Sequence, residues 1–219
     1  MSRLFDVHLP LERAYTREAM LAVELLDAVT LERVTQGVEV TARGLTGKPI
    51  VNYGGLFVWL KEDTTNFDKL LVEPGPQPFE RVEIPAAQVN RPLHTVELKP
   101  LASYPFSPGV TVIRASLIES VPAPGVAPVA IPGATLRLEW LHEDGVTWKP
   151  SPATALTDKA GDFTLILRLA PAEVPTLDAQ GMMTIRLYAK RAAGGEKHQE
   201  FHLLQGRVTD ATYAWDQFQ

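Results

Sequence analysis

The sequence predicts an all-β protein built from two β-sandwiches in tandem, with a short arm at each end of the chain. Three observations lead to this prediction. Apolar residues alternate with polar ones along many segments, turn motifs separate these segments, and one order of segments occurs twice. The 219 residues are enough for one large domain or for two domains of about 100 residues each. The hydrophobic content of 45% is that of an ordinary globular chain.

Alternation is clearest in residues 133–140, where Leu136, Leu138 and Trp140 fall on one face of a strand and Arg137 on the other. A strand with one face in a core and one in water gives this pattern. The same alternation runs through residues 94–100, 163–169 and 182–189. Turn motifs lie between such runs: YGG, EDG, KAGD and AAGGEK. Many short strands punctuated in this way are typical of a sandwich or barrel.

An internal repeat is visible in the order of these features. An alternating segment led by Gly, residues 37–42, is followed by Lys48-Pro49, a polar turn that ends in Gly, and a second alternating segment with Phe near its start. The same order returns from residue 133, with a longer loop near residues 142–145. The corresponding pairs are Gly37 and Gly133, Gly55 and Gly161, and Phe57 and Phe163. We interpret the repeat as two similar domains.

The second copy carries a family resemblance. From residue 112 to 169 it reads as a first strand, PGATLRL, a polar segment and TDKAGDFTL, which resembles carboxypeptidase regulatory-like domains. These domains are immunoglobulin-like, transthyretin-like β-sandwiches related in architecture to Cna-B repeats. The resemblance implies a non-catalytic role as a spacer, accessory or binding module. It also implies that Asp158 bonds to the backbone after it, Gly161 adopts a positive φ and Phe163 enters the core, so that the turn closes a hairpin.

The predicted boundaries follow from the repeat. Residues 11–28 contain helix formers as well as a strand pattern, and we expect an arm or short helix as far as Ala19 followed by a strand. The seam is expected near Pro105 and Pro108, which stiffen a short link. The predicted parts are an N-terminal arm (1–19), a first sandwich (20–108), a second sandwich (109–209) and a C-terminal arm (210–219).

Composition excludes several classes of partner and chemistry. The net charge is −5 and no cluster of Lys and Arg occurs, so we expect no nucleic-acid binding. The longest apolar stretch, residues 121–138, is interrupted by four prolines and is not a membrane span. The absence of Cys removes disulfides, thiol chemistry and Cys-ligated zinc. The first 20 residues lack the pattern of a secretory signal, so we expect a cytoplasmic protein, including one that ends in a particle released from the cell.

No local motif of catalysis, cofactor binding or metal binding is present. The sequence has no Gly-x-Ser-x-Gly elbow, Gly-rich phosphate loop or His-Glu-x-x-His motif. His198 and His202 have the spacing of a helical metal pair, but their segment reads as a strand, in which four residues span about 13 Å. His142 to Asp144 reads as a hairpin tip rather than a cation site. We therefore expect a protein that is not an enzyme and needs no cofactor or metal.

The aromatic and apolar residues near the two ends are the candidate contacts with other protein subunits, including copies of the same chain. Such residues are enriched in the cores of interfaces. The alternative is that each tail folds back on its own sandwich. The candidate partner-binding residues are Leu4, Phe5, Tyr15, Tyr213, Trp215 and Phe218.

Two functions are compatible with these features. The first is a structural or adaptor subunit of a larger assembly, such as a phage-tail-like or contractile-injection particle, that docks through its arms and sheet edges. The alternative is an accessory module that binds a ligand such as a carbohydrate. Trp148 lies in an expected loop and is the candidate stacking residue, whereas the strand pattern predicts that Trp59 and Trp140 are core residues.

Overall fold

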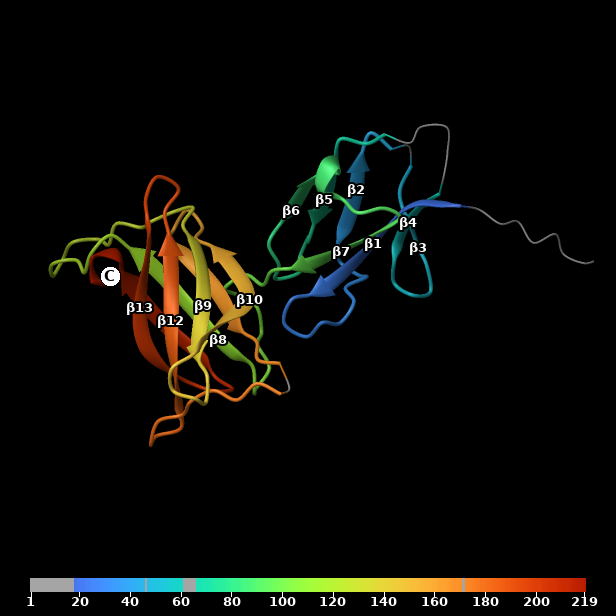
Figure 1. The fold of residues 1–219 in the computed structure, drawn as a ribbon. Coiled ribbons are helices and arrows are strands. Elements are labelled where there is room, and N and C mark those ends of the chain that lie inside the picture. The colour runs from blue at the N-terminus through green and yellow to red at the C-terminus, as the bar shows by residue number, and fades with distance from the viewer. Residues whose placement is uncertain (1–17, 46, 61–65, 171) are drawn as a thin grey trace, which may run out of the picture.

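A computed structural model describes residues 18–45, 47–60, 66–170 and 172–219. In these residues the chain forms fourteen strands and two short 3-10 helices, η1 (Ala86–Gln88) and η2 (Trp215–Gln217), and it is all-β as predicted. Figure 1 shows two β-sandwiches, one after the other along the chain, joined by a short link. The described residues contain no helix with the length and apolar character that a membrane crossing requires.

The first sandwich consists of two facing sheets, in the strand orders β3-β4-β1-β7 and β2-β5-β6. In these strands the side chains alternate between the core and the outer face. In β5, for example, Leu70 and Val72 are buried while their neighbours are half-buried. The strands are β1 (Ala19–Asp27), β2 (Glu39–Arg43), β3 (Ile50–Val51), β4 (Phe57–Leu60), β5 (Lys69–Glu73), β6 (Val82–Pro85) and β7 (Leu93–Leu98).

The second sandwich consists of sheets in the strand orders β10-β9-β12-β13 and β11-β8-β14. Its longer strands alternate as the sequence predicts, and Leu136, Leu138 and Trp140 of β9 are fully buried. The strands are β8 (Thr111–Ile118), β9 (Thr135–Leu141), β10 (Trp148–Leu156), β11 (Asp162–Leu167), β12 (Met182–Lys190), β13 (Glu196–Leu204) and β14 (Val208–Ala214).

The two sandwiches connect their strands in nearly the same way. The first strand of each, β1 or β8, pairs antiparallel with the fourth strand and parallel with the seventh. The second, fifth and sixth strands form the facing sheet in each case. The difference lies in the third strand, because β10 pairs with β9 whereas β3, only two residues long, pairs with β4. As a result β9 has a neighbour on both sides, and β2 is paired with β5 alone among the described residues.

Each sandwich encloses its own hydrophobic core. The first core contains Trp59 and the second contains Trp140, so both tryptophans are core residues as predicted. The first core is built from residues between Leu21 and Tyr104 and the second from residues between Ile113 and Phe218. Burial of this apolar surface is the main force that stabilises each sandwich.

The turn at Asp158 has the predicted local structure but a different place in the topology. The carboxylate of Asp158 accepts hydrogen bonds from the backbone nitrogens of Ala160 (2.8 Å) and Asp162 (2.9 Å). Gly161 has a φ of +80° and Phe163 is buried. The prediction that this turn closes a hairpin is wrong, because β10 and β11 belong to different sheets. The turn instead forms a corner between the two layers.

The C-terminal residues are not a separate arm in this structure. Residues 208–214 form β14, which pairs in parallel with β8, and the backbone of Gln219 exchanges two hydrogen bonds with His198 of β13. The predicted boundary at residue 209 is therefore corrected, since the second sandwich continues to the end of the described chain. The predicted N-terminal arm lies outside the described residues up to residue 17.

Candidate functional site

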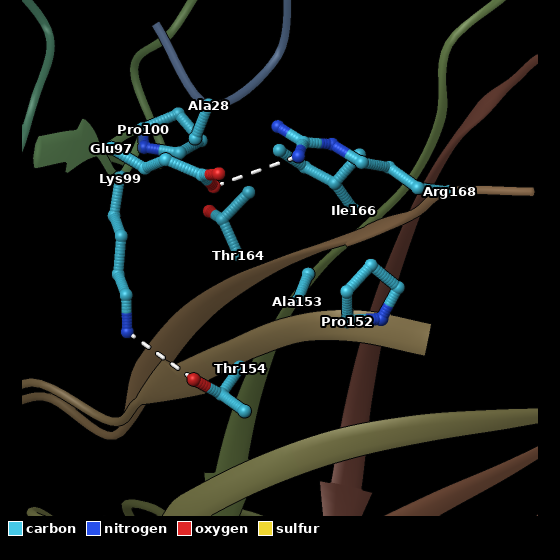
Figure 2. Close-up of a pocket in the computed structure, with 10 residues that line it drawn as sticks. All are labelled: Ala28, Glu97, Lys99, Pro100, Pro152, Ala153, Thr154, Thr164, Ile166 and Arg168. Atoms are coloured by element: carbon cyan, nitrogen blue, oxygen red, sulfur yellow. Dashed lines mark hydrogen bonds and ion pairs between the residues drawn. The ribbon is translucent and has the colours of Figure 1, made fainter. Parts of the chain in front are cut away.

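A cleft lies at the junction of the two sandwiches and has a volume of about 300 Å³ (Figure 2). On one side it is lined by the end of β7 and the residues after it, and on the other by β10 and β11. The middle of β10 deviates from regular pairing with β9 between Pro150 and Thr154, because Pro has no N–H to donate. The residues that line the cleft are Ala28, Glu97, Lys99, Pro100, Pro152, Ala153, Thr154, Thr164, Ile166 and Arg168.

The charged side chains of the cleft make two contacts across the junction. The guanidinium of Arg168 lies 3.5 Å from the carboxylate of Glu97. The ammonium of Lys99 donates a hydrogen bond of 3.4 Å to the hydroxyl of Thr154. Both contacts connect the first sandwich with the second, as the dashed lines in Figure 2 show. The cleft is thus a seam that is lined by both sandwiches and crossed by two polar contacts.

The cleft does not contain a catalytic constellation among the residues that the structure describes. Its hydroxyls belong to Thr154 and Thr164, and neither has a His or Asp partner that could activate it. The hydroxyl of Thr164 is buried and has no hydrogen-bond partner in the described chain. No group of three or more His, Asp or Glu residues that could hold a metal ion occurs within the described ranges.

The link between the sandwiches is fixed at both ends. Tyr104 and Phe106 pack with the core of the first sandwich, and Arg114 of β8 donates a hydrogen bond of 3.3 Å to the backbone oxygen of Tyr104. The guanidinium of Arg114 also lies 5.6 Å from the ring of Phe106. Further along, the backbone nitrogen of Gly109 donates to the oxygen of Gly206 in the second sandwich (3.2 Å). A short link held in this way restricts the relative motion of the two sandwiches.

Glu80 is a half-buried acid close to this seam. Its backbone nitrogen donates to the oxygen of Lys99. Burial raises the pKa of the Glu80 carboxyl, the nearby Lys99 ammonium opposes that rise, and Asp158 of the second sandwich adds to it. The charged form of Glu80 is therefore less favoured in the folded protein than it is in water.

The edge of β2 that has no neighbour among the described residues, called the free edge below, borders a second hollow, a groove of about 540 Å³ between β2 and the segment that leads to β3. Its lining combines apolar side chains, with Val40 and Phe57 buried at its base and Val51 exposed at its rim, with the charged side chains of Glu39 and Lys48. An unpaired edge beside an apolar groove is the usual acceptor for an added strand. The sequence did not indicate this site, because the pairing of β3 with β4 instead of β2 has no local signal beyond the shortness of the Ile50–Val51 run.

The structure places the C-terminal candidates for partner binding inside the second sandwich. Tyr213 and Phe218 are buried in its core, where the rings of Tyr213 and Phe201 lie 5.4 Å apart. Trp215 is partly buried against the same core and stacks on Phe218. The tail folds back on its own domain, which is the alternative stated above, so Tyr213 and Phe218 are core residues while Trp215 remains partly exposed. The N-terminal candidates Leu4, Phe5 and Tyr15 lie outside the described residues.

Trp148, the candidate carbohydrate-stacking residue, is the first residue of β10 and not a loop residue as expected. The guanidinium of Arg186 lies 3.7 Å from the centre of its ring. Arg186 also forms an ion pair with Glu200. One face of the indole is therefore occupied by a cation, which leaves less of the ring for a sugar.

The described histidines and the hairpin tip belong to no group of three or more residues that could hold a metal ion. His198 and His202 both lie in β13, as their strand pattern predicts. His198 contacts the ring of Tyr188, whereas His202 lies 3.6 Å from the carboxylate of Asp178. Asp144 accepts hydrogen bonds from the hydroxyl of Thr147 and from backbone nitrogens, and these bonds lower its pKa to about 2. The Asp144 carboxylate therefore stabilises the turn in which it lies.

Comparison with known proteins gives only distant likenesses. No family model matches the chain, and no curated protein matches it. The shaft pilin SpaA of Lactobacillus rhamnosus GG, solved as a double mutant, is 11% identical with a TM-score of 0.26, over 91% of this chain and 98% of the pilin. A candidate adhesin of Bacteroides ovatus is 10% identical with a TM-score of 0.25, over 93% of this chain and 92% of the adhesin. Likenesses this distant establish neither a shared activity nor a shared partner.

Proposed function

We propose that this protein is a non-catalytic structural or adaptor subunit of a larger protein assembly, in which it docks through its N-terminal segment and the edges of its sheets. The two sandwiches are proposed to be tandem copies of one domain, since they connect their strands in nearly the same order. The tandem unit acts as a spacer that holds its neighbours at a set separation.

The observation that carries this proposal is that the two sandwiches contact each other directly at their junction. The Glu97–Arg168 and Lys99–Thr154 contacts cross the seam, and the link between the domains is fixed at both ends. An enzyme with two domains commonly places its reacting groups in the cleft between them. Here the charged side chains of Glu97, Lys99 and Arg168 contact groups of the facing sandwich, which supports a mechanical role for the junction.

The test is a gentle purification of the tagged protein from its native host, with mass spectrometry and negative-stain microscopy of the eluate. The proposal expects a set of partner proteins in fixed ratios or a visible particle. A variant with residues 1–15 replaced by a Gly/Ser linker of equal length should lose the partners and keep its circular dichroism spectrum and melting temperature. A full-length protein that always elutes alone contradicts the proposal.

We further propose that the assembly is of the phage-tail-like or contractile-injection kind, made in the cytoplasm and released from the cell. The support is indirect, namely β-sandwiches without cysteine and an acidic surface with a net charge of −5. Negative-stain images distinguish this case from others, because a tail-like particle has a tube or sheath of recognisable shape. Partners that form a membrane complex or a simple dimer overturn this part of the proposal.

A further inference from the structure

The first sandwich is one strand short at a defined place. Gly37 and Gly133 both lie two residues before the second strand of their sandwich, with φ of +72° and +68°. Residues 39–41 of β2 therefore correspond to residues 135–137 of β9. In the second sandwich, residues 154–156 of β10 pair with these positions of β9. In the first sandwich the corresponding edge of β2 has no neighbour among the described residues.

The groove described above lies along this part of β2. Val38, Glu39, Val40 and Thr41 form one wall, so the groove covers the positions that β10 covers in the second sandwich. The opposite wall is the segment from Gly47 to Val51 together with Phe57. The site thus offers both unpaired backbone groups and an apolar pocket for alternate side chains of an extended segment.

The N-terminal segment has the sequence pattern that such a site requires. Phe5, Val7, Leu9 and Leu11 are apolar and occupy every second position. In an extended strand these four side chains point to one side, and the residues between them point to the other.

A proline in this segment is compatible with an edge position. Pro10 lies between two of the apolar residues and has no N–H to donate. Prolines are found on edge strands, where one row of backbone groups needs no partner. β10, the strand at the corresponding edge of the second sandwich, itself contains Pro150 and Pro152.

We propose that residues 5–11 of a second copy of this chain bind along the free edge of β2 as an added antiparallel strand, with Phe5, Val7, Leu9 and Leu11 facing the groove. This inference rests on the proposed function and names the partner surface of the assembly. Chains that dock in this way, each into the next, form a head-to-tail array.

The reach of the segment favours a second copy over the same chain. β2 begins at the end of the sandwich where β1 ends (Figure 1), so a strand antiparallel to β2 runs in the direction of β1. Its last residue, Leu11, then lies at the opposite end of the sandwich from Ala19, where β1 begins. The nine residues of β1 span about 27 Å and the facing sheets are about 10 Å apart. The residues between Leu11 and Ala19 cover at most about 27 Å when fully extended. This length is used up along the sandwich, so the segment is too short to cross between the sheets and reach β2 of its own chain.

A cross-linking experiment tests the proposal, since the natural chain has no cysteine. One chain carries His8→Cys and a tag, and the other carries Thr41→Cys, at an exposed position of β2. The two are mixed and treated with a short bis-maleimide. The matched control replaces Thr41→Cys with Thr212→Cys, an exposed Thr on the edge strand β14. The proposal expects the tagged heterodimer with Thr41→Cys and its loss with Thr212→Cys; equal yields overturn it.

Competition by synthetic peptides tests the proposed face of the strand. A peptide of residues 1–17 should suppress the heterodimer, and the same peptide with Leu9→Asp should not. The peptide with His8→Asp should still suppress it, because residue 8 points away from the groove. Equal competition by the two substituted peptides overturns the proposed orientation.

Two further outcomes separate this inference from the proposed function. A chain with both His8→Cys and Thr41→Cys that cross-links only within itself overturns the assignment to a second copy. If the native partners depend on residues 1–15 but the heterodimer does not form, this inference fails and the proposed function remains. If the heterodimer forms but no native assembly is found, the proposed function fails and this inference about the β2 edge remains.

Discussion

The hydroxyl of Tyr104 donates a hydrogen bond of 2.5 Å to the buried carboxylate of Asp27. Asp27 is the last residue of β1, and its carboxylate also accepts a hydrogen bond of 2.6 Å from the backbone nitrogen of Val29. Tyr104 begins the link to the second sandwich, and Ala28 lines the cleft between the sandwiches. One buried pair therefore connects the end of the first strand with the start of the interdomain link.

Replacing Tyr104 by Phe should destabilise the first sandwich by about 1.5–3 kcal/mol, because a hydrogen bond to a buried charged group is lost. The measurement is chemical denaturation followed by fluorescence. Tyr53→Phe is the matched control, since the side chain of Tyr53 is fully exposed and its hydroxyl contributes no buried hydrogen bond. Equal effects of the two substitutions would show that the Asp27–Tyr104 contact does not stabilise the fold.

The same pair predicts a dependence on alkaline pH. Burial and the hydrogen bond to Asp27 raise the pKa of the Tyr104 hydroxyl. A raised pKa favours the protonated form, so its stabilising contribution is present below the ordinary tyrosine pKa of about 10 and is lost as the pH rises above it. The stability difference between the natural protein and Tyr104→Phe should therefore shrink above about pH 10. A constant difference up to pH 12 contradicts this account.

Gly161→Ala should destabilise the second sandwich strongly. The φ of +80° costs a residue with a Cβ about 1–2 kcal/mol, and the new Cβ would lie 2.5 Å from the backbone oxygen of Leu117. Gly145→Ala is the control, because Gly145 has a similar φ of +68° but nothing within 4 Å of the new Cβ. Denaturation of both variants separates backbone strain from the clash, and similar losses would show that the corner relaxes without cost.

Local features of the fold were predictable from sequence, and long-range ones were not. The alternation around Trp140 and the Asp158–Gly161 turn depend on neighbouring residues, and both have the expected local structure. The partner of each strand depends on the whole sandwich, so the corner at Gly161 was mistaken for a hairpin. Tyr213 was mistaken for an arm residue because its strand pairs in parallel with β8, far away in sequence, and has only a weak apolar pattern of its own.

The groove beside β2 likewise combines a local feature that the sequence shows with a long-range one that it does not. The apolar alternation from Phe5 to Leu11 is present in the sequence, but nothing in the sequence indicated an open acceptor edge. That edge arises because β3 pairs with β4, whereas β10 pairs with β9. Propensity and periodicity describe a strand but do not select its neighbour.

Glu80→Gln should stabilise the protein at pH 7. The pKa of the Glu80 carboxyl is raised, chiefly by burial, so its contribution to stability is present below the ordinary Glu value of about 4.3 and is lost as the pH rises through the folded value. Gln keeps the shape without the charge. The gain, measured as a melting temperature, should be present at pH 7 and absent below about pH 4. Glu143→Gln, at an exposed turn, should have no effect at either pH.

The Glu97–Arg168 pair should contribute little to the junction by itself. Its atoms are 3.5 Å apart, and the Glu97 side chain is 56% exposed, so water and salt screen the attraction. A double-mutant cycle with Glu97→Ala and Arg168→Ala should give a coupling energy of about 0–1 kcal/mol. The packed link should instead hold the sandwiches, so small-angle scattering should give the same dimensions for the double mutant and a broader distribution for Arg114→Ala. If the double mutant loosens the protein as much as Arg114→Ala does, the cleft contacts are what fix the two domains.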